Sequence, residues 1–82
     1  MELSKFPRAV TEVVRVALDE AEITHREVTR RTGIPTATLS RRMTGNSPFD
    51  TNEIALIAGI LNVLPSELFR KAEELLTKSR AA

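Results

Sequence analysis

The sequence predicts an all-α fold, a compact arrangement of five short helices. Its apolar residues recur at intervals of three and four along most of the 82 residues, the spacing that places them on one face of a helix. Two pairs, Thr24 with Glu27 and Asp50 with Glu53, have the spacing of a capping box. No segment alternates apolar and polar residues as a half-buried strand does. A chain of this length holds one core, so residues 1–82 are expected to form a single domain.

The first helix is expected over residues 7–22. Pro7 is favourable in a first helical turn, where its missing amide hydrogen is not needed. Packing must stabilise this helix, since its valines have weak intrinsic helix propensity. Its inward face is predicted from the spacing of Phe6, Val10, Val13, Val14, Ala17, Leu18 and Ala21.

The second helix is expected over residues 25–32, with Thr24 and Glu27 capping each other's backbone amides at its start. Val28 is its inward residue. Gly33 ends the helix, because glycine readily adopts the left-handed conformation found at helix ends. The next residue, Ile34, is expected to be a buried anchor.

The third helix is expected over residues 36–44 and ends at Gly45. Leu39 and Met43 lie four residues apart and form its inward stripe. The opposite face then carries short side chains and one arginine, namely Thr36, Ala37, Ser40, Arg41 and Thr44. Such a helix fits the major groove of DNA, which is about 12 Å wide. Arg41 would donate two hydrogen bonds to a guanine, and Thr36 and Ala37 would contact a thymine methyl group.

The last two helices are expected over residues 51–61 and 66–78. Asp50 starts the fourth helix through its capping box. Phe49 precedes it and is expected to pack on Ile54 as a hydrophobic staple, in preference to stacking on a base.

Positive charge is concentrated in the second and third helices. The whole chain has a net charge of +1, but residues 24–48 carry five arginines against one acid, Glu27, for a net +4. The remaining residues carry −3. The planar guanidinium of arginine suits phosphate oxygens and guanine edges. A solvated face would also explain the cluster, and the small, polar face of the third helix favours a nucleic acid.

Other classes of function lack support in the sequence. The absence of Cys excludes a disulfide framework, a thiolate metal site and thiol catalysis. No nucleophile–base pair, metal-ligand set or glycine-rich phosphate loop is present, so no enzyme, cofactor, metal or small-molecule ligand is expected. The longest uncharged run, residues 54–66, is too short to span a membrane, and the N-terminus lacks a signal-peptide pattern. We therefore expect a cytoplasmic protein.

Residues 24–45 resemble the helix-turn-helix of the lambda-repressor and Cro-like family, often called XRE-like. The resemblance rests on Thr24-His25-Arg26-Glu27-Val28 and on Gly33-Ile34-Pro35-Thr36-Ala37-Thr38-Leu39-Ser40-Arg41-Arg42-Met43-Thr44-Gly45. Residues 54–68 are similar to the family's fourth helix and the start of its fifth, so that the resemblance covers roughly residues 8–70. It implies a lambda-repressor-like domain with the helix-turn-helix at its second and third helices. Members bind operator DNA, commonly as dimers, and many are phage or prophage repressors.

The resemblance also implies roles by position. The family's base-reading residues correspond to Thr36 and Ala37, with Arg41 one turn later, and the adjacent Thr38 is expected to reach a base or the sugar-phosphate backbone. His25 stands in place of a polar residue, usually glutamine, that braces the recognition helix and touches phosphate. The loop of residues 44–47 matches a stretch that contacts the DNA backbone. The full set of expected DNA-backbone contacts is Thr24, His25, Arg26, Arg30, Arg31, Ser40, Arg42, Thr44, Asn46 and Ser47.

Two positions depart from the family pattern. Thr29 replaces a small alanine where the second and third helices cross, and its hydroxyl is expected to bond back to the carbonyl of His25. Arg42 replaces an aliphatic residue and is expected to extend from the edge of the core toward phosphate. If Arg42 instead points at the bases, the register of the outward face is off by one residue.

The sequence thus predicts a non-enzymatic, sequence-specific transcriptional regulator that binds operator DNA. The alternative is an antitoxin-like or adaptor module whose partner is a protein and whose DNA binding is secondary. A homodimer would read two half-sites of DNA in place of one. The two subunits would then touch through the fifth helix or through the loop before the fourth. The alternative is that the chain binds DNA as a monomer. The adjacent Leu75 and Leu76 either close the core together or leave one leucine exposed as part of a dimer surface.

Overall fold

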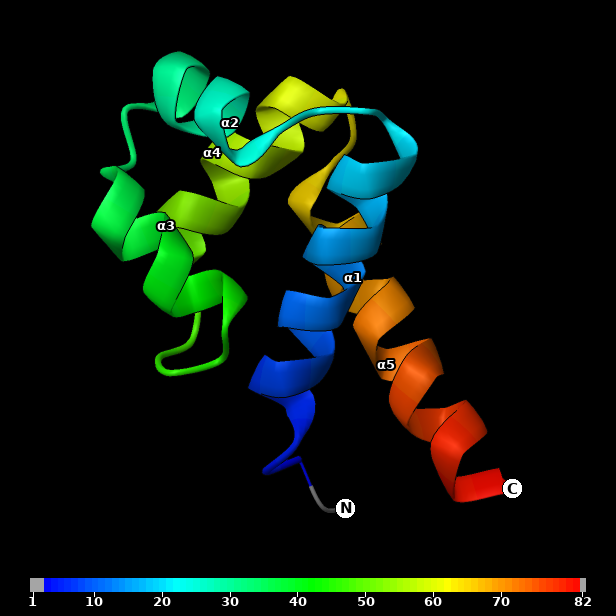
Figure 1. Cartoon of the computed structure of the whole chain (residues 1–82). Helices are drawn as coiled ribbons and strands as arrows, with labels where there is room; N and C mark the ends of the chain where they lie inside the picture. The colour runs from blue at the N-terminus through cyan, green and yellow to red at the C-terminus, as the bar shows by residue number, and fades with distance from the viewer. Residues whose placement is uncertain (1–2, 82) are drawn as a thin grey trace.

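The structure is a computed structural model that describes residues 3–81, with the side chains of residues 3–78. The described chain forms five helices, as Figure 1 shows, and the all-α prediction is confirmed. In chain order they are α1 (Phe6–Glu20), α2 (His25–Thr32), α3 (Thr36–Met43), α4 (Thr51–Leu61) and α5 (Pro65–Ala81).

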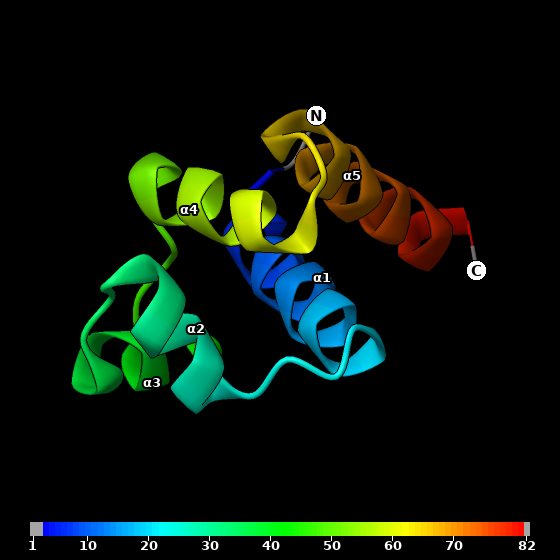
Figure 2. The same cartoon turned by 90° about the horizontal axis from the view of Figure 1, so that it is seen from above.

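The helices form two groups that α4 joins. In Figures 1 and 2, α2 and α3 lie on one side of the molecule, and α1 and α5 lie on the other. α4 contacts both α2 and α5, and α1 contacts α3 as well as α4 and α5. This arrangement places α3 at one edge of the molecule, away from α5, and leaves one of its faces uncovered.

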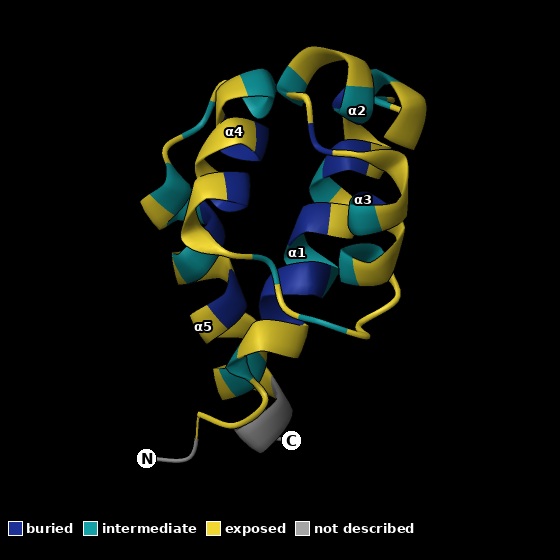
Figure 3. Cartoon of the chain, turned by 90° about the vertical axis from the view of Figure 1, so that its left-hand side faces the viewer, coloured by how far each residue is buried: buried dark blue, intermediate teal, exposed yellow. Residues whose placement is uncertain are grey.

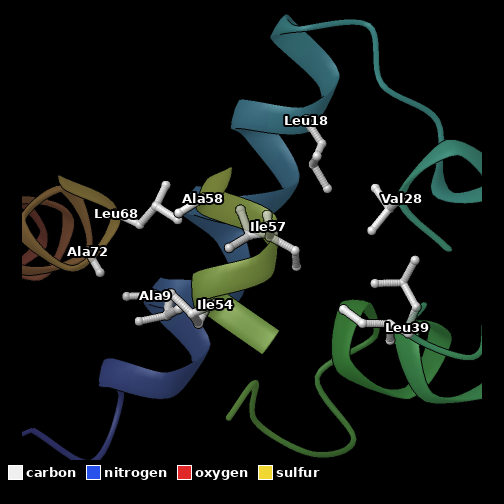
Figure 4. Packing of buried hydrophobic residues seen from close by; sticks show 12 residues of the cluster. Ala9, Leu18, Val28, Leu39, Ile54, Ile57, Ala58, Leu68 and Ala72 are labelled. Carbon is white, nitrogen blue, oxygen red and sulfur yellow. The ribbon is translucent and has the colours of Figure 1, made fainter. Parts of the chain in front are cut away.

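One hydrophobic core receives side chains from every helix (Figure 4). Burying each large aliphatic side chain contributes about 1.5–3 kcal/mol. The core therefore supplies the stabilisation that the valine-rich α1 and the short α2 and α3 lack by themselves. The largest fully buried residues are Val14, Leu18, Val28, Leu39, Ile54, Ile57 and Leu68.

Each helix turns a buried side toward the core and an exposed side outward (Figure 3), and the burial of individual residues answers two questions that the sequence left open. Phe49 is half-buried and packs against the core, as expected of a hydrophobic staple, and Ile54 is fully buried. Leu76 also packs against the core, whereas the side chain of Leu75 is 39% exposed. The second alternative for this leucine pair is therefore correct as regards burial: one leucine closes the core and the other faces outward.

The glycines expected to end α2 and α3 do so. Gly33 and Gly45 have φ angles of +81° and +83°, in the left-handed region that favours glycine. α3 itself ends one residue earlier than predicted, at Met43, and Thr44 is its C-cap. α5 begins at Pro65, within one residue of its predicted start, and continues beyond its predicted end through Ala81.

None of the helices in the described chain is, taken singly, long and apolar enough to cross a membrane. The bent pair formed by Thr51–Leu61 and Pro65–Lys78, with an angle of 103° between its two parts, has the length and composition to do so. The apolar residues of this pair include Ile54, Ile57 and Leu68, which are fully buried in the core. Core packing thus accounts for their apolar character.

The first helix ends two residues before its predicted end, through a left-handed residue that is not glycine. Glu22 has a φ angle of +58°. Its amide donates to the carbonyl of Asp19 at 3.0 Å, and the amide of Ile23 donates to the carbonyl of Leu18 at 2.9 Å. These two hydrogen bonds are the pair that defines a Schellman helix end.

Replacing Glu22 with glycine should stabilise the protein, because an L side chain in the left-handed region costs about 1 kcal/mol. We expect E22G to raise the free energy of unfolding by about 0.5–1 kcal/mol, measured by urea denaturation. The matched control is A21G, since Ala21 has a right-handed φ of −83° and glycine there should destabilise. Equal effects of both substitutions would contradict the assignment.

Candidate nucleic-acid interface

α2 begins and ends in a way that fixes the turn into α3. The Thr24 hydroxyl accepts a hydrogen bond from the Glu27 amide at 3.2 Å. At the other end, the Thr32 hydroxyl donates to the Val28 carbonyl at 2.7 Å and accepts from the Ile34 amide at 3.1 Å. One side chain therefore connects the last turn of α2 to the buried Ile34. This pair of hydrogen bonds was not predicted from the sequence.

Only half of the expected capping box of α2 is present. The Glu27 carboxylate does not return to the Thr24 amide; it pairs with Arg30 and lies 3.9 Å from the Nε atom of Arg31. The two arginines follow Glu27 by three and four residues, so they reach it across one helical turn. The Glu27 carboxylate therefore interacts with these arginines and not with the backbone at the start of α2.

α3 has the register that the sequence predicted. Leu39 is buried, and Met43 is half-buried against the core. The other members of the helix and its C-cap are exposed, apart from Thr38 and Arg42, which are half-buried. The exposed residues of this face are Thr36, Ala37, Ser40, Arg41 and Thr44.

Arg41 is the long side chain on this exposed face. Among the described side chains it forms no ion pair, whereas Arg30 and Arg42 each have a carboxylate partner. A surface salt bridge would give an exposed arginine a structural role, and the described part of the chain offers Arg41 none. Its guanidinium is therefore available to an external acceptor.

The structure corrects the expected orientation of Arg42. Its Nε and Nη2 atoms donate to the two carboxylate oxygens of Glu53 at 2.7 and 3.1 Å, and its Nη1 atom donates to the Ser47 hydroxyl at 2.6 Å. The guanidinium thus points toward α4 and the connecting loop, neither outward into solvent nor along the exposed face of α3. A carboxylate buried at the start of α4 attracts it more strongly than solvent does, since a bidentate pair has high geometric complementarity.

Glu53 itself binds two partner residues at once, Arg42 and Asp50. Its carboxylate also accepts from the Asp50 amide at 2.9 Å, and Asp50 accepts from the Glu53 amide at 2.7 Å, so the predicted capping box is confirmed. The hydrogen bonds from Arg42 lower the pKa of the Glu53 carboxyl against the opposing effect of burial. Hydrogen bonding to Glu53 likewise raises the pKa of Arg42. Glu53 therefore remains charged although its residue is only 8% exposed.

The predicted backbone-contact residues differ in the donors that they can offer. The oxygens of Thr24 and Ser47 accept hydrogen bonds within the chain, which leaves their hydroxyl hydrogens available for a phosphate. The Thr44 hydroxyl lies 3.0 Å from the Ser40 carbonyl and 3.2 Å from that of Arg41, so its hydrogen is already engaged. Ser40 and Asn46 are exposed.

The remaining predicted residues lie on or beside α2. His25 and Arg26 are exposed in its first turn, and His25 borders a hollow shared with the end of α1. Within the described chain, Thr29 does not make the expected hydrogen bond to the His25 carbonyl; it is half-buried, and the back-bonding hydroxyl of α2 is that of Thr32.

The structure adds one basic residue that the sequence analysis missed. Arg8, in the first turns of α1, lines a small hollow together with the loop residues Gly45, Asn46 and Ser47. It is exposed, and no ion pair engages it among the described side chains. A contact between residues this far apart in the chain leaves no local sequence signal. Arg8 extends the positive surface of α2 and α3 toward α1.

A scan against protein families finds one that matches residues 13–71, described as the Cro/C1-type HTH DNA-binding domain. The match spans most of the chain and includes α2, the turn and α3. The protein belongs to this family. The resemblance drawn from the sequence is thereby confirmed, and with it a helix-turn-helix at α2 and α3 of a DNA-binding domain. Searches of curated proteins and of solved structures find no match.

The Cro/C1-type domain holds no candidate metal site in its described part, where no three His, Asp or Glu residues come together. The exposed face of α3 and the basic residues around it thus form the candidate interface. The Arg42–Glu53 pair lies behind this face and holds the end of α3, the loop and the start of α4 together.

Replacing Glu53 with glutamine should destabilise the domain by about 1–3 kcal/mol at pH 7, because a charged hydrogen-bond acceptor is lost from a buried site. The folded-state pKa of Glu53 is lowered, so its contribution is fully present above the ordinary Glu pKa of about 4.3. It is lost as the pH falls through the lower folded value. Urea denaturation should therefore show a wild-type advantage over E53Q that is constant from pH 7 to 5 and shrinks below that range.

The matched control is E67Q. Glu67 also accepts a hydrogen bond from the amide three residues before it, that of Leu64 at 3.0 Å, but this site is exposed and has no arginine. E67Q should change stability much less than E53Q. A loss as large as that of E53Q would show that capping, and not the ion pair with Arg42, carries the effect.

Proposed function

We propose that this Cro/C1-type protein is a sequence-specific transcriptional regulator of the repressor type, which reads operator DNA by placing α3 in the major groove. The observation that carries the proposal is the exposed face of α3, where short side chains surround a single unpaired arginine, Arg41. A helix with such a face can approach base edges closely. Thr36 and Ala37 lie in its first turn, where they would meet thymine methyl groups. The half-buried Thr38 reaches a base or the sugar beside it.

Phosphate contacts would come from the surfaces flanking α3. The exposed His25 and Arg26 open α2, while Arg30 and Arg31 occupy its last turn. On the other flank lie the loop after α3 and Arg8. Contacts of this kind fix the position of the protein on the duplex and carry little sequence information.

Two further properties belong to this proposal. The protein acts without catalysis, in the cytoplasm, by occupying its operator. A second copy would bind a neighbouring half-site, because reading two half-sites one helical turn apart doubles the recognition that one domain achieves.

One observation favours the alternative function, a module that mainly binds another protein. Val16 and Leu75 are 41% and 39% exposed and line a groove between α1 and α5. A measurement of DNA affinity over a range of salt concentrations separates the two functions. Direct DNA binding predicts an affinity that falls steeply with salt, since each neutralised phosphate releases counterions. No binding even at low salt would exclude the regulator.

Arg41→Ala should remove a bidentate contact to a base. On an operator selected from random-sequence DNA, we expect a loss of about 1–3 kcal/mol and a relaxed preference at one base pair. Binding to random DNA should change much less. Fluorescence anisotropy titrations on both DNAs measure the difference, with Arg70→Ala on α5 as the control, since Arg70 pairs with Glu74 away from α3. Equal losses on both DNAs would make Arg41 a phosphate contact instead.

Removing single basic residues at the flanks should have the opposite signature. Arg26→Ala, Arg31→Ala and Arg8→Ala should each weaken binding to the operator and to random DNA by a similar factor. Each should reduce the slope of log affinity against log salt by about 0.9, the value for one phosphate. A loss confined to the operator would contradict the assignment of that residue to phosphate.

A further inference from the structure

Glu27, the only acid among residues 24–48, has contacts that helix capping does not explain. Three glutamates, Glu27, Glu53 and Glu67, are each the third residue of their helix. The carboxylates of Glu53 and Glu67 turn back and accept a hydrogen bond from a backbone amide just before the helix, at 2.9 and 3.0 Å. The carboxylate of Glu27 turns the other way, along α2. It pairs with Arg30 and lies 3.9 Å from the Nε atom of Arg31.

This carboxylate cancels part of the positive charge of α2, the helix that packs beside α3 (Figure 2). Glu27, Arg30 and Arg31 together carry a net charge of +1, and without the carboxylate they would carry +2. A guanidinium donates the same planar set of hydrogen bonds to a carboxylate as to a phosphate. Glu27 therefore engages donors that a phosphate of DNA would also use.

The fold of α2 does not depend on this ion-pair cluster. The side chains of Arg30 and Arg31 are 69% and 42% exposed, and that of Glu27 is 34% exposed. Ion pairs so open to water contribute little to folding. The start of α2 is held by the Thr24 hydroxyl and its inward side by Val28, which is fully buried. The cluster is weak enough for a ligand to displace the carboxylate, and its main effect falls on the ligand.

We propose that Glu27 competes with DNA phosphate for Arg30 and Arg31 and thereby lowers the affinity of the protein for any duplex. The inference rests on the proposed function, in which α2 supplies phosphate contacts. Such contacts carry little sequence information, so the loss of affinity is the same on operator and on random DNA. Arg41, on the exposed face of α3, lies outside the cluster. Glu27 thus sets how tightly the protein holds DNA, and α3 sets which sequence it prefers.

The test is Glu27→Gln, which removes the charge and keeps the size of the side chain. One more effective positive charge should steepen the slope of log affinity against log salt by about 0.9. If wild type and variant bind alike at about 1 M salt, the variant gains about tenfold in affinity at about 50 mM salt and about fourfold at about 200 mM. Fluorescence anisotropy titrations should show the same gain on operator and on random DNA, and circular dichroism verifies that the variant is helical.

The matched control is Glu12→Gln. Glu12 also pairs with an arginine three residues later, Arg15, but this pair lies on α1, and Glu12 lines the groove toward α5. The substitution therefore changes the net charge and breaks an ion pair in the same way. It should leave the affinity for both DNAs within about twofold of wild type. A gain as large as that of Glu27→Gln would make net charge alone the cause and overturn the inference.

A second comparison separates competition from simple repulsion between Glu27 and DNA. In a protein with Arg30→Ala and Arg31→Ala, adding Glu27→Gln should give no further gain, because the donors for which Glu27 competes are absent. A gain that persists there would mean direct repulsion and would overturn the inference. Wild-type DNA binding without any gain in Glu27→Gln would overturn the inference alone and leave the regulator function in place. No binding of either protein at low salt would overturn both.

Discussion

The ion pair between Arg42 and Glu53 is the constraint on which the position of α3, the second helix of the helix-turn-helix, depends. α3 comes close to α2 and α1 along the described backbone, but not to α4. The end of α3 is therefore joined to α4 through side chains, and the two hydrogen bonds from Arg42 to Glu53 are the polar part of that connection. The third donor of Arg42 holds Ser47, in the loop between the two helices. One guanidinium thus connects the end of α3, the loop and the first turn of α4.

The chemistry of the pair suits this task. Glu53 is the third residue of α4 and forms the capping box with the N-cap Asp50, so the first turn of that helix already fixes its position before Arg42 is considered. A guanidinium bound by two parallel hydrogen bonds has little freedom to turn, unlike an aliphatic side chain at the same place. The pair adds little net free energy of folding, because burying the two charges costs desolvation energy. What the pair contributes above all is a defined orientation of α3 relative to α4.

The other end of α3 is fixed by different means. Gly33 supplies the left-handed turn, Ile34 inserts into the core, and the hydroxyl of Thr32 connects the two. Contacts on the core side of α3 thus fix both of its ends. The exposed face that carries Arg41 therefore needs no contacts within the chain to hold the helix in place. That is the condition under which exposed side chains can be reserved for a ligand.

The sequence was sufficient to predict the elements that local patterns determine. The five helices, the stop at Gly33, the capping box at Asp50 and the register of α3 all follow from spacings shorter than two helical turns. It was insufficient where the partner is remote or two partners compete. Arg42 finds Glu53 eleven residues away, across a loop whose path no local pattern specifies. Glu27 has a helix amide and two arginines within reach, and spacing alone did not predict that the arginines win.

The distribution of charge follows from the same architecture and bears on how the domain binds DNA. Residues 24–48, which include α2 and α3, carry a net charge of +4, while the groove between α1 and α5 is lined by acids and lysines together. A net charge of +1 therefore combines a surface that attracts phosphate with one that does not, which orients the domain as it approaches a duplex. The total attraction to random DNA is correspondingly small, since it scales with the number of phosphates neutralised. Under the proposed function, recognition would come from the few side chains on the exposed face of α3. Pairing two such domains would be the most direct way for so small a face to bind a particular sequence tightly.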